Sequence, residues 1–150
     1  MLPIRLELHN FLAYRDPQPL RFEGIHLACL TGANGAGKSS ILDAITWSLW
    51  GEARARSDND LVHMGQVDMS VMLEFEQDGT RYRVMRKRSR KGSGTTQLTL
   101  HALLEDGTLN NLTESSIRAT QQSINRKLRM TYKTFVNSAF CSRARPMRSQ

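Results

Sequence analysis

The sequence has little of what extracellular and membrane proteins depend on. Its two cysteines are too few for a disulfide framework, and neither stands at the spacing of a metal-ligand motif. No stretch approaches the roughly 18 consecutive apolar residues of a membrane-spanning helix, and the start of the chain alternates apolar and polar residues, unlike a signal peptide. Hydrophobic residues make up 39% of the 150, with a mean hydropathy of -0.45, which is typical of one globular domain. We expect a cytoplasmic protein without membrane contact.

Acidic residues are scarce in the second half of the chain. Residues 1–80 contain 6 Lys or Arg and 11 Asp or Glu, whereas residues 81–150 contain 15 Lys or Arg and 3 Asp or Glu. Such an asymmetry favours a polyanionic partner for the second half, with nucleic acid as the obvious candidate. A solvated basic surface that faces an acidic segment outside this chain explains the same pattern, and charge alone leaves both interpretations open.

One stretch carries a recognisable chemical motif. Gly32–Ser39 fits G-x-x-x-x-G-K-[ST], the phosphate-binding loop of nucleoside triphosphatases. The mostly apolar run His26–Thr31 predicts a buried strand before it, and Lys38–Trp50 predicts a helix after it, closed by Gly51. One helix face is predicted to point inward, with Ile41, Leu42, Ile45, Leu49 and Trp50. Strand, glycine loop and helix follow in the order that the motif requires.

The residue types in this motif suit the binding of a nucleotide. Gly35 and Gly37 allow positive φ, so that backbone N–H groups turn toward phosphate oxygens, and the helix N-terminus adds further unpaired N–H groups. Lys38 is expected to reach the β- and γ-phosphates, and the Ser39 hydroxyl to coordinate Mg²⁺. The alternative is a tight turn with a merely solvated lysine.

The remaining pattern predicts strands and one further helix. Asp60–Gly65 looks like a short helical turn, Gln77–Thr80 like a hairpin turn, and Arg88–Thr96 like a mobile basic loop. A helix is expected from Glu114 to Leu128, with Thr113 as N-cap, Ile117, Ile124 and Leu128 inward, and Arg118, Arg126, Lys127 and Arg129 outward. Alternation predicts strands at Ile4–His9, Leu20–Phe22, Val67–Glu76, Arg81–Lys87 and Gln97–Leu104.

Several ordered motifs together resemble a known family. GANGAGKSSILDAI at residues 32–45 leads into LWG, and DLVHMG at 60–65 and YKTFVNSAF at 132–140 follow. This set resembles the N-terminal half of the ATPase head of SbcC-type DNA double-strand-break repair proteins, relatives of the SMC proteins. The resemblance covers residues 4–140 and implies an α/β P-loop NTPase (ABC-ATPase-like) half-domain over 1–140, with an antiparallel β-hairpin layer.

The resemblance also assigns roles to single residues. It implies that ATP and Mg²⁺ are the cofactors, that Lys38 is catalytic, and that Ser39 is the metal ligand. Many relatives carry an arginine after the Asn-Phe of the first connector, where this chain has Leu12. The residues implied to contact the nucleotide are Asn34, Gly35, Ala36, Gly37, Lys38, Ser39 and Ser40 at the triphosphate, with Val62, His63 and Met64 nearby.

Family members assemble a complete site from several parts. The C-terminal half of the head, beyond a long coiled coil, brings the Walker B acid, and two heads dimerise around ATP, bind double-stranded DNA and work with an SbcD-like nuclease. Glu74 and Glu76 lie on an alternating strand, which does not suit a Walker B role. We therefore expect this chain alone to bind ATP without efficient hydrolysis. The alternatives are a stand-alone nucleic-acid-binding module and another P-loop ATPase such as an ABC transporter subunit.

Residues 141–150 depart from the family pattern. They contain three arginines and no acid, where relatives have a Gln-containing loop and an acidic stretch. We hypothesise that the reading frame slips near Phe140, because a one-nucleotide shift lets these codons spell Leu-Gln-Ser-Gly-x-Ala-Asp-Glu. The alternative is a diverged loop whose arginines contact DNA phosphates. Sequencing the gene across these codons decides: a second frame that continues through such a loop into heptads supports the slip, and stop codons in every frame contradict it.

Overall fold

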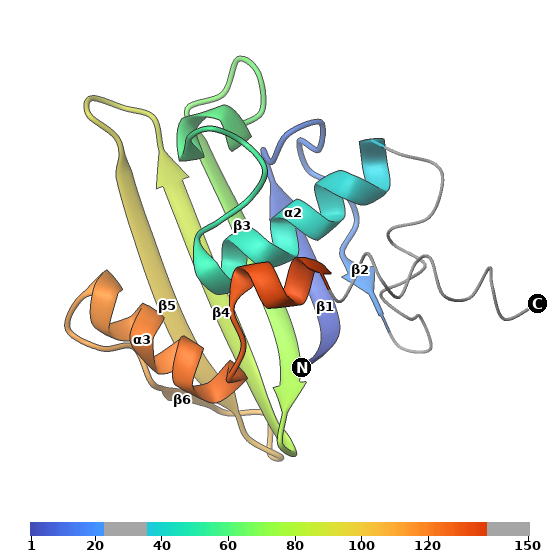
Figure 1. Cartoon of the computed structure of the whole chain (residues 1–150), viewed down its shortest axis with the longest axis vertical. Coiled ribbons are helices and arrows are strands. Elements are labelled where there is room, and N and C mark those ends of the chain that lie inside the picture. Colours follow the sequence, from blue (N-terminus) through green and yellow to red (C-terminus); the bar gives the residue numbers. More distant parts are fainter. Residues whose placement is uncertain (23–35, 138–150) are drawn as a thin grey trace, which may run out of the picture.

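The computed structural model describes residues 1–22 and 36–137. The strand predicted at His26–Thr31 and the tail at 141–150 lie outside these residues. A six-stranded antiparallel sheet carries helices on one face, among them a short helical segment at residues 132–137 (Figure 1). Its elements are β1 (Leu2–His9), β2 (Leu20–Arg21), α2 (Ala36–Trp50), the 3-10 helix η1 (Asp58–Leu61), β3 (Asp68–Gln77), β4 (Thr80–Ser89), β5 (Thr95–Leu103), β6 (Leu109–Asn111) and α3 (Ile117–Leu128).

The strands follow the order β2-β1-β3-β4-β5-β6, so β3 and β4 lie at the centre of the sheet. The predicted β3–β4 hairpin is confirmed: Asp78 and Gly79 have φ of 54° and 81°, the left-handed conformation that a two-residue hairpin turn requires. The prediction of a mobile basic loop at Arg88–Thr96 was too wide. Strand β4 runs to Ser89 and β5 starts at Thr95, because pairing continues along both strands to the Ser89–Thr95 pair.

Alternation along the strands separates a buried face from a polar face. Leu73, Val84 and Leu100 stand in register on three strands, are fully buried, and form the floor under the helices. On the opposite face the Glu74 carboxylate accepts hydrogen bonds from Arg83 at 2.6 and 2.9 Å and lies 3.6 Å from Arg5. Glu74 is therefore an ion-pair partner of two arginines on the sheet.

From Leu42 onward helix α2 is buried on all sides, whereas the sequence predicted a single inward face. Every residue from Leu42 to Trp50 is buried, including Trp47, which the predicted face omitted. Two buried hydroxyls are satisfied inside the helix: Thr46 donates to the carbonyl of Asp43 at 3.1 Å, and Ser48 donates to that of Ile45 at 2.8 Å. Gly51 ends the helix with φ of 72°, and its N–H donates to Trp47 O at 2.8 Å, as predicted.

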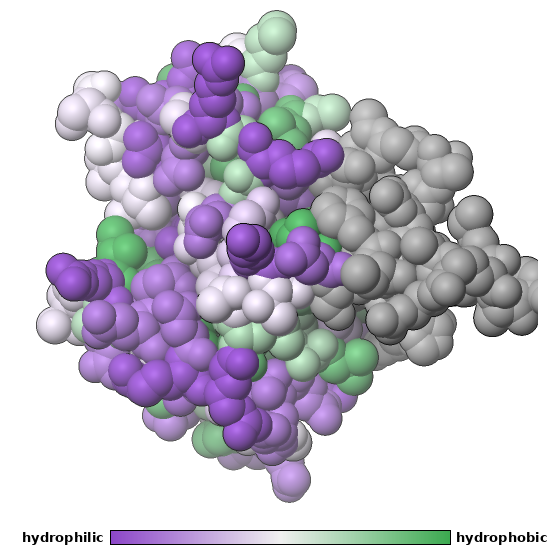
Figure 2. Space-filling view, in the orientation of Figure 1, coloured by the Kyte–Doolittle hydropathy of each residue, from purple (hydrophilic) through white to green (hydrophobic). Residues whose placement is uncertain are grey.

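Helix α3 begins later than predicted. Its N-cap is Ser116, whose hydroxyl accepts the N–H of Ala119 at 3.1 Å. The Thr113 hydroxyl instead accepts the N–H of Leu100 at 2.9 Å at the edge of β5, so the prediction of Thr113 as cap was wrong. Ile117, predicted to point inward, is 41% exposed because it now stands in the first turn, whereas Ile124 is buried as expected. Figure 2 shows a largely hydrophilic surface over this helix.

Candidate functional site

The start of α2 carries the end of the phosphate-loop motif. Asn34 and Gly35 lie outside the described residues, whereas Ala36, Gly37, Lys38 and Ser39 form the first turn of the helix. The helix therefore starts before the predicted Lys38. Gly37 is helical backbone rather than the left-handed residue that we predicted, because a right-handed α-helix has negative φ. Ser40 follows at the start of the next turn.

Beside this turn lies a hollow of about 550 Å³. It brings together three of the predicted site residues, Ser40, Val62 and Met64, which come from α2 and from the segment after η1. His63 does not line the hollow. The described lining is Leu12, Ala13, Ser40, Asn59, Asp60, Val62, Met64 and Arg90. The nucleotide contacts assigned to these residues by resemblance stay predictions.

The His63 side chain supports one wall of the hollow. Its Nδ1 lies 2.6 Å from the carbonyl oxygen of Leu12, and since a carbonyl only accepts, this nitrogen carries the proton. Two backbone hydrogen bonds join the same segments: His63 N–H donates to Asn10 O and Leu12 N–H donates to Leu61 O, both at 2.7 Å. Leu12 has φ of 51°, uncommon for a leucine, and these bonds hold it there.

The 3-10 helix η1 forms part of the other wall, and two long side chains hold it in place through hydrogen bonds. Trp47 Nε1–H donates to Asp58 Oδ1 at 3.2 Å, and Arg88 Nε–H donates to Asn59 Oδ1 at 3.0 Å. These bonds link η1 to the P-loop helix and to the end of β4. The local sequence pattern does not predict these hydrogen bonds, because the partners are 11 and 29 residues apart.

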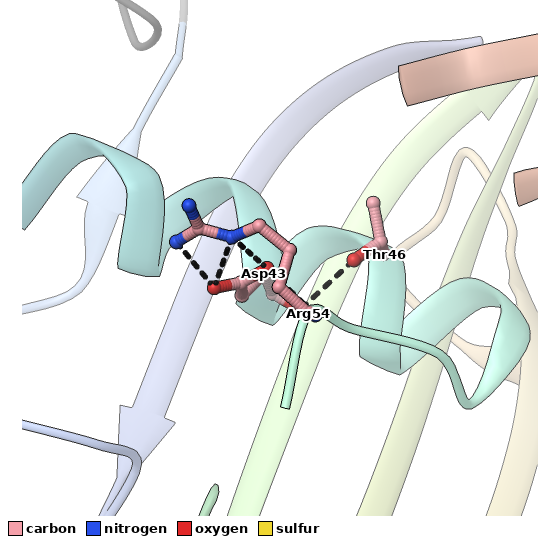
Figure 3. A network of polar contacts seen from close by, with 3 residues as sticks. All are labelled: Asp43, Thr46 and Arg54. Carbon is pink, nitrogen blue, oxygen red and sulfur yellow. Dashed lines mark hydrogen bonds and ion pairs between the residues drawn. The ribbon is translucent and has the colours of Figure 1, made fainter. Parts of the chain in front are cut away.

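An arginine–carboxylate pair clamps the loop after α2 against the helix (Figure 3). The buried Asp43 carboxylate accepts from Arg54 Nε at 3.1 Å and from Nη2 at 2.8 Å, a bidentate contact, and also from the Arg54 backbone N–H at 3.3 Å. The hydrogen bonds that the Arg54 guanidinium donates to Asp43 raise its pKa. Sequence analysis missed this pair, although Asp43 in a predicted helix and Arg54 in the next loop were both visible.

The C-terminal end of α2 is capped by a buried arginine from the sheet. Arg86 is 4% exposed, donates to Ser48 O at 3.3 Å and to Gln121 Oε1, and lies 5.8 Å from the centre of the Trp47 ring. Gln121 in turn donates to Leu49 O at 2.8 Å. Burial lowers the pKa of Arg86 to about 10. The arrangement places a positive charge at the negative end of the P-loop helix.

Comparison of the sequence with protein families identifies the family of this chain. The family model described as an AAA domain matches residues 5–149, nearly the whole chain. The chain belongs to the AAA domain family. This AAA domain is of the SbcC/Rad50 type, as its relatives indicate, and the resemblance drawn from the sequence is confirmed.

The relatives of this AAA domain include a nuclease subunit and DNA double-strand break repair ATPases. It is 36% identical over 138 residues to the SbcC component of the nuclease SbcCD of Deinococcus radiodurans, which covers 90% of this chain and 15% of that protein. It is 39% identical over 92 residues to the DNA double-strand break repair Rad50 ATPase of Thermoplasma volcanium, which covers 61% of this chain and 10% of that protein. The chain thus spans a small part of the length of these relatives.

Solved structures show the same fold. A structure described as concerning ATP-driven dimerization and DNA-stimulated activation of SMC ATPases matches this AAA domain with a TM-score of 0.58 and 22% identity, over 87% of this chain and 81% of that one. The recombination mediator RecF with ATP matches with a TM-score of 0.52 and 16% identity, over 77% of this chain and 29% of that one. The fold is therefore that of P-loop NTPases, as predicted. Among the helices of the described ranges, none is long and apolar enough to cross a membrane.

Proposed function

We propose that this AAA domain binds Mg-ATP and presents half of a composite ATPase site in an SbcC/Rad50-type DNA-repair protein. The observation that carries the proposal is the continuity of the site: the motif Gly32–Ser39 runs into the first turn of α2, and the next residue, Ser40, lines the hollow. Lys38 would contact the β- and γ-phosphates, and Ser39 would hold Mg²⁺, which neutralises charge that develops on the phosphates.

Hydrolysis is proposed to need a second half of the head. The buried carboxylates of the described sheet and P-loop helix are occupied: Glu74 is paired with Arg83, and Asp43 is paired with Arg54. A carboxylate whose oxygens are engaged by an arginine is not placed to accept a proton from an attacking water. We therefore propose that the catalytic acid comes from the C-terminal half, joined through a coiled coil, and that two such heads dimerise around ATP.

Double-stranded DNA, an SbcD-like nuclease and a cytoplasmic location complete the proposal. These assignments are supported by the relatives, which include a subunit of the nuclease SbcCD and a DNA double-strand break repair ATPase. The excess of basic residues in 81–150 favours binding to a polyanion such as DNA. The same excess also supports a second candidate function, that of a stand-alone nucleic-acid-binding module. The two differ in whether DNA binding depends on ATP.

The variant Lys38→Ala tests the proposal. Removing the ammonium group takes a charge-assisted contact from the triphosphate, and we expect Mg-ATP affinity, measured by calorimetry, to fall by up to roughly a hundredfold. In the assembled head, DNA binding measured with and without ATP should lose its ATP dependence. Lys133→Ala, which removes an exposed lysine outside the motif, serves as the charge-matched control. DNA binding that is unaffected by ATP in the wild-type head would favour the nucleic-acid-binding module instead.

A further inference from the structure

Three arginines stand at alternate positions toward the hollow: Arg86 and Arg88 on β4, and Arg90 directly after it. Arg86 is buried against the end of α2, and Arg88 donates to Asn59 at 3.0 Å and to Thr96 at 2.9 Å. Both guanidinium groups are therefore engaged in holding the fold. The third is different, because within residues 1–22 and 36–137 the Arg90 side chain has no hydrogen bond or ion pair.

The backbone places Arg90 at the rim of the hollow. Its N–H donates to Val67 O at 2.9 Å, which extends the β3–β4 pairing by one residue and anchors the base of the following turn. The side chain is exposed and lines the hollow. An arginine side chain carries a large rotamer entropy. The Arg90 backbone is anchored while its guanidinium makes no hydrogen bond or ion pair with the described residues, so the guanidinium is available to a ligand in the hollow.

The rest of the lining suits the nucleoside part of a nucleotide. Leu12, Val62 and Met64 offer apolar surface, and Met64 is 89% exposed. Asn59 and Asp60 offer polar groups beside that surface. Binding sites for small molecules commonly combine an apolar lining with a few polar groups that fix orientation. A flat base with polar edges and a ribose with two hydroxyls match this combination better than a phosphate chain does.

The resemblance already implies nucleotide contacts for Val62 and Met64 in this hollow; beyond them, we propose that the Arg90 guanidinium stacks on the base of a nucleotide bound there. The inference rests on the proposed ATP binding at Gly32–Ser39. Ser40 lies directly after that motif and lines the hollow, so a nucleotide whose triphosphate lies on the helix N-terminus has its nucleoside end within reach. A planar guanidinium stacks on aromatic rings, which lysine does not do.

The test compares a ligand that has a base with one that lacks it. Mg-ATP and inorganic tripolyphosphate are titrated by calorimetry into the wild-type chain and into Arg90→Ala. We expect Arg90→Ala to weaken ATP binding by about tenfold and to leave tripolyphosphate binding unchanged, because only ATP places a base against the guanidinium. Arg90→Lys should restore little of the lost ATP affinity, since it keeps the charge without the planar group.

Two further variants separate local contact from general electrostatics. Lys91→Ala removes the same charge from the next residue of the same turn, which is exposed and does not line the hollow, and it should bind ATP as the wild type does. Ala13→Trp, at an exposed position of the lining, should fill the hollow and weaken ATP binding but not tripolyphosphate binding. Ala13→Ser is its control.

Each other outcome counts against the inference. Equal losses for ATP and tripolyphosphate would show that Arg90 contacts phosphate, and an unchanged ATP affinity with weaker DNA binding would assign Arg90 to DNA. Either result overturns the base contact while leaving ATP binding intact. Failure of the proposed function itself looks different: the wild-type chain would then bind neither ligand, or Lys38→Ala would bind both as well as the wild type.

Discussion

Trp47→Ala is expected to lower the free energy of unfolding by about 3–5 kcal/mol, the range for truncating a large aromatic residue in a packed core. Trp47 is fully buried on α2, with its ring 6.2 Å from that of Phe11. Truncation leaves a cavity between the P-loop helix and the first connector and removes the hydrogen bond to Asp58. Urea unfolding followed by circular dichroism should show a lower midpoint with an unchanged slope.

Trp47→Phe is the matched control. It keeps an aromatic ring against Phe11 and loses only part of the volume and the bond to Asp58, so we expect about 1 kcal/mol. Since Asp58 is half-buried, water can solvate its carboxylate after the change. Equal destabilisation by the two variants would mean that the hydrogen bond, and not the packing of the ring, makes α2 stable.

Arg86→Ala is expected to lower the free energy of unfolding by about 3 kcal/mol. The change removes the donor to Ser48 O and to the Gln121 side chain and takes the arginine stem away from Trp47. Each buried acceptor without a partner costs about 1–3 kcal/mol. Against this loss stands a gain, because burial lowers the pKa of Arg86 to about 10, so keeping it charged costs the native state about 3 kcal/mol.

Arg86→Met separates these contributions. Methionine keeps most of the stem, avoids the cost of burying a charge and still leaves the acceptors unpaired, so the opposing effects nearly cancel and we expect a loss of about 1 kcal/mol. If methionine destabilises the chain as much as alanine does, the charge at the end of α2, and not the packed stem, is what the fold requires. Both variants are measured by urea unfolding at neutral pH.

The sign of the pH dependence follows from the same lowered pKa. Between pH 10 and the ordinary arginine pKa, the unfolded chain binds more protons at this position than the native chain does. Stability attributable to Arg86 therefore rises with pH in that window, because the cost of the buried charge disappears as the native group loses its proton. Below pH 10 the cost is fully present and constant. Arg86→Met should lack this contribution to the slope.

Local patterns sufficed for much of the fold. The β3–β4 hairpin follows from strict alternation around Asp78-Gly79, a turn whose positive φ angles only a few residue types accept. The glycine end of α2 follows in the same way from Gly51. The start of α3 was misplaced because Thr113 and Ser116 are both good N-caps. Ser116 is the N-cap in the structure because the Thr113 hydroxyl is hydrogen-bonded to the Leu100 backbone of β5 instead.

The sequence by itself determined the chemistry of the motif and the family, because a phosphate loop needs particular residues at particular spacings along the chain. Only the tertiary structure decided that Val62 and Met64 share a hollow with Ser40 while His63 holds the wall beside them, and that Arg90 reaches the same hollow from the sheet. These relations join residues that are far apart along the chain. Periodicity reports which face of an element is buried, but it cannot report which distant element covers that face.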